Sequence, residues 1–286
     1  NGHKLFQAKF LDDKALDGFS GLHIKLLDRQ ERQFKAMQIS LFLKQKEEIL
    51  VRLQRFKSIN PDPDCGRDFT KQQSNPFFDI EQWILRFART GRPTISRSLT
   101  IGARQQISHF GLGITFDLAS EIVQDWITTR TAFWARRVNE ETSRLLMAEL
   151  QESQKLGESI PQIQQRVEKV FAFNDRVRSE MIARTEIQSA TNQGALEAYL
   201  QSDVVEQKMW LTTLDDRTRD HHVEAHRQTV DKHDNFIVGG ESLPRPGMGG
   251  PENSINCRCI MAPVLRTERR MPIKRMPEDL LRGVKS

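Results

Sequence analysis

The sequence predicts a mainly α-helical α+β protein, with long N-terminal helices followed by a small β-containing C-terminal module. Two long stretches before residue 157 repeat apolar residues at helical spacing, with charged residues between them. After Ser202 the pattern changes to short apolar runs, separated by a stretch rich in Gly and Pro. We therefore expect a helical body over residues 1–156, the module over residues 157–263 and a basic tail over residues 264–286.

The helical body is predicted to contain three main helices. The first spans residues 16–57 and ends at the Asn-, Pro- and Asp-rich stretch of residues 60–66. The second spans residues 77–90, because we expect Gly91 and Pro93 to end it, and residues 102–113 are expected to form a loop with a short helix. The third spans residues 118–156 and is followed by Gly157.

The module is predicted to begin with two more helices. Ser159, Pro161 and Gln162 form a capping-box sequence with Pro in the first turn, which predicts a helix start. Asn174 is expected to cap the next helix, which reaches about residue 201 and is apolar on more than one face. A strand is predicted over residues 204–211, and a closing strand over residues 259–262.

The charge is modestly positive but unevenly distributed. The chain has 286 residues, with 43 Lys and Arg against 38 Asp and Glu. Residues 82–116 contain no acidic residue but carry five arginines that could face DNA phosphates, although a solvated surface is equally open: Arg86, Arg89, Arg92, Arg97 and Arg104. No apolar run approaches the length of a membrane-spanning helix, so no membrane partner is expected.

A short C-terminal span concentrates residues that bind metals. His222 and His226 lie four positions apart, and Cys257 and Cys259 lie two apart. Two imidazoles and two thiolates suit a tetrahedral structural zinc ion. The Cys pair is more closely spaced than in common zinc knuckles, so packing and hydrogen bonding are the alternative role for all four.

The helix that contains Arg184 and Glu186 is expected to be largely surrounded by protein. The two side chains are two positions apart and therefore poor partners for each other. Buried charges need partners, and Asp215, Asp216 and Arg217 are the candidates. A clamp between this helix and the module is favoured over a catalytic Arg–Glu pair.

Several separated motifs resemble the phage Mu F-like minor head proteins. In order they are Ile182–Glu186, Asn192–Ala195, Trp210–Thr212, Asp216–Arg219, His222 and His226, Gly240–Glu241, Pro246–Gly247 and Ile255–Cys259. Arg227 and Met248 depart from the family pattern, in which Gly and Asp are usual. Arg184, Glu186, Asp216 and Arg217 match it as a structural signature, and the resemblance implies no catalytic residue.

The resemblance implies a structural virion protein of a tailed phage rather than an enzyme. It would lie inside the head at the portal vertex, after assembly in the bacterial cytoplasm, and act in head morphogenesis and in DNA packaging or ejection. Its expected partners are the portal protein, other copies of itself and packaged double-stranded DNA. Some family modules are fused behind a portal protein, which is compatible with a chain that starts at Asn1.

The alternative is a metal-dependent nuclease or another enzyme packaged in the head. Six residues could in principle form its site: Asp220, His221, His222, Asp231, His233 and Asn235. They lack the His-Asn-His order of such nucleases, so the structural interpretation is preferred.

Overall fold

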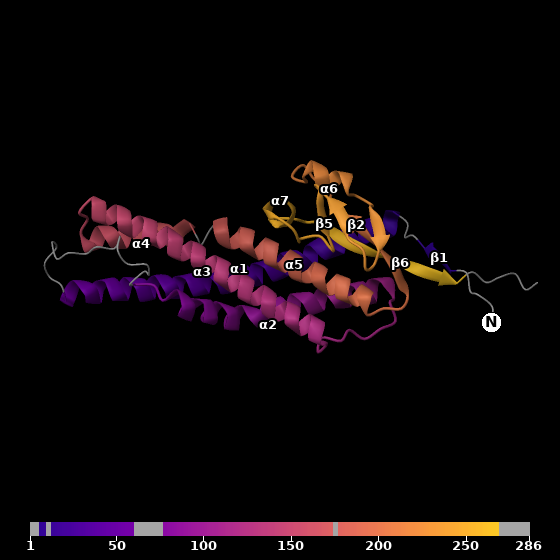
Figure 1. Cartoon of the computed structure of the whole chain (residues 1–286), viewed down its shortest axis with the longest axis horizontal. Helices are drawn as coiled ribbons and strands as arrows, with labels where there is room; N and C mark the ends of the chain where they lie inside the picture. Colours follow the sequence, from indigo (N-terminus) through magenta and orange to yellow (C-terminus); the bar gives the residue numbers. More distant parts are fainter. Residues whose placement is uncertain (1–5, 10–12, 60–76, 174–176, 269–286) are drawn as a thin grey trace, which may run out of the picture.

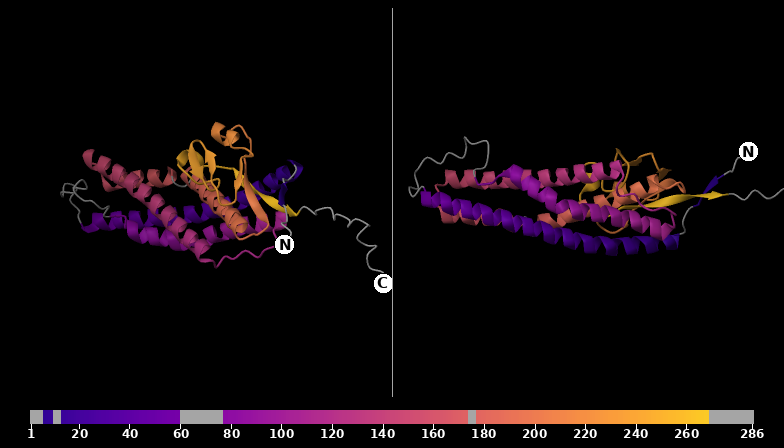
Figure 2. Two further views of the ribbon diagram at one scale, coloured as in Figure 1. Left: turned by 45° about the vertical axis from the view of Figure 1, so that its right-hand side comes forward. Right: turned by 90° about the horizontal axis from the view of Figure 1, so that it is seen from below.

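The computed structural model describes residues 6–9, 13–59, 77–173 and 177–268, and these form an elongated helical bundle with a small β module near one end (Figure 1). The helices of the bundle are α1 (Asp13–Ile59), α2 (Ile80–Phe110), α3 (Glu121–Lys155), α4 (Ile160–Phe173) and α5 (Ser179–Leu200). With 47 residues, α1 is about 70 Å long and runs along the whole length of the bundle (Figure 2). The predicted fold class, mainly α with a small β-containing module, is confirmed.

Among the described residues, the module consists of six β-strands and two short helices. Its strands are β1 (Phe6–Lys9), β2 (Val205–Leu211), β3 (Thr229–Asp231), β4 (Phe236–Val238), β5 (Glu241–Leu243) and β6 (Ile260–Glu268), and its helices are α6 (Asp220–Glu224) and α7 (Pro251–Ser254). Four strands form an antiparallel sheet in the order β1-β6-β2-β3, while β4 and β5 form a separate hairpin. In the register Trp210 faces Met261, and Phe6 faces Glu268. The boundary of the predicted tail at residue 264 falls inside β6.

The predicted end of the second helix is wrong, because α2 continues through Gly91, Pro93 and Gly102. It begins at the cap made by Asp79, whose carboxylate accepts the Gln82 N–H at 3.1 Å, and it ends at Gly111 with φ of 63°. A Cβ atom at Gly91 would clash with the Trp134 ring. The glycine is therefore a contact point between α2 and α3, and not a helix end.

The helix start predicted before α4 is found, with the Gln162 half of the capping box. The Gln162 side chain accepts hydrogen bonds from both the backbone N–H and the hydroxyl of Ser159, at 2.8 and 2.7 Å. Asn174, Cys65 and the part of the basic tail after residue 268 lie outside the described residues. None of the described helices is both long and apolar enough to cross a lipid bilayer.

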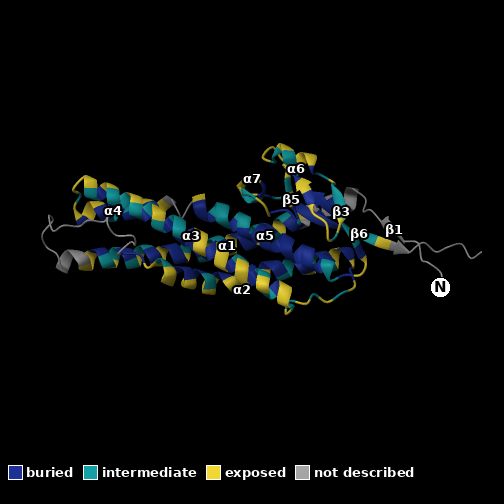
Figure 3. Ribbon diagram, viewed as in Figure 1, coloured by how far each residue is buried: buried dark blue, intermediate teal, exposed yellow. Residues whose placement is uncertain are grey.

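One helix belongs to both hydrophobic cores. The first part of α5 contributes Ala183 and Ile187 to the bundle core, which is rich in Phe and Trp, while Leu196 and Tyr199 pack in the core of the module. Nearly the whole of α5 is buried, as its sequence predicts (Figure 3). The bundle core and the module core therefore both pack against the same helix, α5.

The crossing of α5 with α2 is very close. A Cβ atom at Gly102 would overlap the Thr191 carbonyl, and one at Gly194 would overlap the Leu99 carbonyl. Only glycine allows two helix backbones to approach this far. This crossing fixes the position of α5, and α5 in turn carries Arg184 to the site described next.

Candidate functional site

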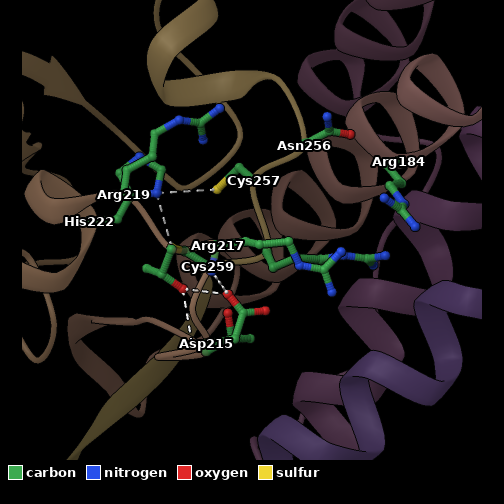
Figure 4. A pocket seen from close by; sticks show the side chains of 11 residues that line it. Arg184, Asp215, Arg217, Arg219, His222, Asn256, Cys257 and Cys259 are labelled. Atoms are coloured by element: carbon green, nitrogen blue, oxygen red, sulfur yellow. Dashed lines mark hydrogen bonds between the residues drawn. The ribbon is translucent and has the colours of Figure 1, made fainter. Parts of the chain in front are cut away.

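A cavity of about 310 Å³ lies where the module meets α5 (Figure 4). Its walls come from the loop after β2, from α6, from the loop before β6 and from α5. The lining residues are Arg184, Thr213, Asp215, Arg217, Thr218, Arg219, His222, Asn256, Cys257, Arg258 and Cys259. Two types of side chain dominate these walls, namely metal-ligand residues and arginines.

The metal-ligand residues converge at one side of the cavity. The Nδ1 atom of His222 lies 3.4 Å from the Cys259 Sγ and 4.0 Å from the Cys257 Sγ. The three potential ligand atoms all lie within 4.8 Å of one another, and each residue is about 2% exposed. Among the described residues this is the single group of three or more His, Cys, Asp or Glu residues arranged to hold a metal ion.

The orientation of the His222 ring is set by its neighbours. Its Nε2 atom lies 3.0 Å from the Asn253 Oδ1. The Asn253 amide in turn donates to the Glu241 carboxylate at 2.9 Å and to the Val238 carbonyl at 3.3 Å. The Glu241 carboxylate also accepts the Gly250 N–H at 3.0 Å. Because the Asn253 amide nitrogen donates to Glu241 and Val238, the Asn253 Oδ1 atom accepts a hydrogen bond from the His222 Nε2–H.

The two cysteines differ electrostatically. A hydrogen bond from Cys259 lowers the pKa of Cys257 well below its usual value. The pKa of Cys259 is raised, because this thiol donates to Cys257 and is itself buried. Cys257 is therefore the more acidic thiol of the pair.

Four arginines surround the cavity, and three of them have fixed partners. Arg258 makes a two-pronged ion pair with Glu31 of α1, at 2.6 and 3.0 Å. Arg184 pairs with Glu180 at 2.7 Å, and Arg219 donates to the Ile255 carbonyl at 2.7 Å. The backbone N–H of Arg217 donates to the Asp215 carboxylate at 3.1 Å, and its side chain projects into the space shown in Figure 4.

The expected partners of the Arg184 and Glu186 pair are not the ones found. Glu186 accepts two hydrogen bonds from Arg130 of α3, at 2.8 and 3.0 Å. Arg184 pairs with Glu180 and lies 3.9 Å from Glu31. Glu186 therefore ties α5 to α3, whereas Arg184 pairs within α5 and only approaches α1; Asp215, Asp216 and Arg217 of the module were the expected partners. Asp216 belongs to the same structural signature as Arg184, Glu186 and Arg217, and it is exposed in the turn before α6.

His226 does not join the metal-ligand group. Its Nδ1 atom accepts the backbone N–H of Thr212 at 3.1 Å. His226 follows the end of α6, where Ala225 caps the helix, so the two histidines do not share a helical face as their spacing suggested. The structure thus brings together three of the four predicted ligands, namely His222, Cys257 and Cys259.

The residues of the alternative nuclease site are dispersed. His233 and Asp231 contact each other through a backbone N–H, and Asn235 donates to the Ser242 hydroxyl. His221 stacks at a right angle on His222 but lines a different cavity, next to Glu241. Of the six, His222 alone belongs to the metal-ligand group of the described residues.

The five arginines predicted to face DNA are all exposed on α2, away from this cavity: Arg86, Arg89, Arg92, Arg97 and Arg104. Sequence reasoning missed Arg258 at the cavity and Asn253, which contacts His222 from outside the cavity. Arg258 lies between the two cysteines, and this position could have drawn attention to it. No signal in the sequence connects Asn253 with His222, because 31 residues separate them.

One comparison with known proteins matches the C-terminal part of the chain to a family of phage proteins. Residues 146–262 match the family described as Phage Mu protein F like protein, and this part of the chain is a phage Mu F-like domain. The matched segment starts near the end of α3 and includes every residue that lines the cavity. The resemblance found in the sequence is confirmed for this segment, and it indicates a protein of phage head morphogenesis. The comparisons with curated proteins and with solved structures gave no match.

Proposed function

We propose that this head protein is a structural component inside the capsid at the portal vertex, where it binds the portal protein, further copies of itself and packaged double-stranded DNA. Membership of its C-terminal domain in a head-morphogenesis family supports a structural role in the particle. The observation that carries the DNA contact is the arginine row of α2, which we define as Arg86, Arg89, Arg92, Arg97 and Arg104.

The arginine row is long enough to follow a nucleic-acid backbone. Arg86 and Arg104 are 18 positions apart, which corresponds to about 27 Å along the helix axis. Arg97 lies between them on the same side of α2, because 11 and 7 residues are close to whole numbers of helical turns. The one acidic residue within α2 is Glu81, in its first turn. The surface of α2 therefore combines positive charge with little local compensation.

Three arginines of the row are available for phosphate. Arg86 pairs with Glu48 at 2.8 Å, and Arg92 donates to the side chains of Thr128 and Gln124. Arg89, Arg97 and Arg104 have no hydrogen-bond or ion-pair partner among the residues that the structure describes. Arginine binds phosphate oxygens through its planar guanidinium group, and such contacts give affinity without sequence preference.

A salt titration of DNA binding tests the arginine row. We expect the triple variant Arg89→Gln, Arg97→Gln, Arg104→Gln to bind duplex DNA more weakly. The slope of log affinity against log salt should become shallower by about 2.7, since each phosphate contact contributes about 0.9. Fluorescence anisotropy at several salt concentrations measures both quantities.

The matched control removes the same charge from α3. Arg136, Arg137 and Arg144 are exposed, and each lies within reach of a glutamate. Their triple Gln variant should keep the wild-type slope. Equal slopes for the wild type and both variants would exclude the row as the DNA-binding surface.

The position at the portal vertex has its own test. Exposed apolar side chains on the bundle, among them Leu85 at 70% and Ile122 at 71% exposure, support docking of its helices on other subunits. A map of intact particles should show elongated density of this length against the portal ring. Mass analysis of the same particles would show whether the virion polypeptide is this chain or the C-terminal part of a portal fusion. Density elsewhere in the head would overturn the placement.

A metal-dependent nuclease is the second candidate, and one observation favours it. The cavity combines three metal-ligand residues with four arginines, and arginines are suited to holding a phosphodiester. Incubation of the protein with DNA and divalent metal should leave the DNA intact if the role is structural. Cleavage by the wild type that is lost in His222→Ala would favour the nuclease.

A further inference from the structure

We propose that His222, Cys257 and Cys259 bind one zinc ion, and that the fourth ligand of this ion comes from the adjoining cavity. The ligand atoms would be the Nδ1 of His222 and the Sγ atoms of the two cysteines. Zinc binding at this site does not depend on DNA contact or on the position of the protein in the particle.

The distances between the ligand atoms suit a tetrahedral ion. Zinc binds sulfur at about 2.3 Å and nitrogen at about 2.0–2.1 Å, so two ligands of one tetrahedral ion lie about 3.5–3.8 Å apart. The two nitrogen–sulfur distances observed are 3.4 and 4.0 Å. Small side-chain rotations would make both equal. The backbone has therefore already brought the ligand atoms of the two cysteines and the α6 histidine to within 4.8 Å of one another, close to the spacing that zinc requires.

The hydrogen bonds around His222 prepare its Nδ1 for a metal. A neutral imidazole has one protonated nitrogen and one free lone pair. The Asn253 oxygen can only accept, so the proton of His222 lies on Nε2, and the Nδ1 lone pair faces the two sulfur atoms. The Glu241 carboxylate fixes the Asn253 amide from behind. A metal-bound histidine generally has such an outer partner, which holds the ring orientation.

The charges of the site are compatible with zinc. Two thiolates neutralise a divalent cation, so the bound complex adds no positive charge beside the four arginines. A simple thiol–imidazole packing contact would not account for two buried cysteines that converge on the unprotonated nitrogen of a fixed ring.

The fourth coordination position opens toward the cavity. His226 is used elsewhere, by the Thr212 N–H. The three ligand residues themselves line the cavity, whose volume of about 310 Å³ leaves room for a water molecule on the metal. Three protein ligands with one exchangeable ligand distinguish this site from closed structural sites, in which four protein ligands surround the ion.

Metal analysis of the purified full chain tests zinc binding directly. Elemental analysis by inductively coupled plasma mass spectrometry should find one zinc ion per chain in protein purified without chelators. X-ray absorption should give two sulfur neighbours at about 2.3 Å and two nitrogen or oxygen neighbours at about 2.0 Å. A wild-type protein that retains no zinc, and that does not take up added equimolar zinc in competition with a chromophoric chelator, would overturn the proposal.

Ligand variants locate the ion. Cys257→Ser, Cys259→Ser and His222→Ala should each weaken zinc binding by more than the roughly 10–100-fold loss that removal of an outer partner causes. Asn253→Ala should fall within that 10–100-fold range and keep two sulfur neighbours. Circular dichroism identifies any variant that does not fold, and the wild-type measurements decide the question in that case.

Two matched controls separate this site from other arrangements. Cys65→Ser and His226→Ala should bind zinc about as tightly as the wild type, within roughly threefold. A loss in His226→Ala as large as that in His222→Ala, or four protein ligands in the absorption spectrum, would contradict the three-ligand site. Retention of zinc in the Cys257→Ser and Cys259→Ser double variant would contradict it as well.

Discussion

The bundle and the module use buried polar side chains in different ways. In the bundle, many of them bond to the backbone of their own helix, one turn earlier. Thr131, Asn139 and Thr142 all donate to the carbonyl four residues before them. In the module, buried polar groups bond across large sequence distances. The Asn192 amide reaches the Cys259 carbonyl, and Tyr199 donates to Gln106 and to the Met261 carbonyl.

The contrast shows where the specificity of this fold lies. Local bonds satisfy part of the polar groups in the bundle, where apolar packing contributes most to helix association, although Asn139 and Thr142 also accept bonds from Gln45 and Arg178. Bonds between distant segments exist only when those segments are correctly placed. Arg245 of the module is such a case. It is buried against α5 and donates to the Gln193 side chain at 2.6 Å, and this burial lowers the pKa of Arg245 to about 9. The module is therefore specified by polar contacts with α5.

Substitutions that disrupt the close crossing of α5 with α2 should have the largest effect on stability. In Gly102→Ala or Gly194→Ala, a new methyl group would overlap a backbone carbonyl of the opposite helix, and neither helix can move without breaking other contacts. We expect the free energy of unfolding to fall by about 3 kcal/mol or more. Urea denaturation followed by circular dichroism measures it.

The control for both variants is Gly21→Ala on α1, where no atom lies within 4 Å of the added methyl group. This substitution should stabilise the protein by up to about 1 kcal/mol, because alanine favours the helix. If Gly102→Ala were as stable as Gly21→Ala, the close crossing of α2 and α5 would not hold the two regions together.

Acid should weaken the contact between α1 and its neighbours through His23. This residue is buried, its Nδ1 lies 2.8 Å from the Gln105 Oε1, and burial lowers its pKa from 6.5 to about 4. Between these two pH values the unfolded chain binds a proton that the folded protein excludes. The stabilisation is therefore complete above pH 6.5 and is lost as the pH falls to 4, by about 3 kcal/mol.

Denaturation curves from pH 7 to pH 4 measure the His23 contribution. The variant His23→Gln has no titrating group, so its stability should fall less steeply over this range than that of the wild type. Arg258, which approaches from the module, also disfavours the charged imidazole. Identical pH profiles for the two proteins would show that His23 does not exclude the proton.

Loss of one long-range polar bond should affect the module selectively. In Asn192→Ala the Cys259 and Pro246 carbonyls lose a donor inside the protein. We expect a loss of about 1–3 kcal/mol and faster proteolytic cleavage within residues 205–268. The control Ile187→Val, on the part of α5 that faces the bundle, should cost about 0.5–1.5 kcal/mol without selective cleavage of the module. Equal protection of the module in both variants would remove the distinction between the two regions.

The same contrast explains what could be predicted from the sequence. Helical spacing located α1, α3 and α4, because their apolar faces and caps are local features. It ended α2 too early, since Gly91 and Pro93 are usual breakers and the contact of Gly91 with Trp134 spans 43 positions. The convergence of His222 with both cysteines could be anticipated from residue types alone. The partners Asn253 of His222 and Arg130 of Glu186 could not, because many amides and arginines compete for such roles.

The pairing of β1 with β6 has a consequence for how the molecule can be connected. Because Phe6 lies opposite Glu268, both ends of the described fold leave from one corner of the sheet. Segments that precede Phe6 or follow Glu268 therefore connect to the fold at that corner. The far tip of the bundle lies about 70 Å away along α1.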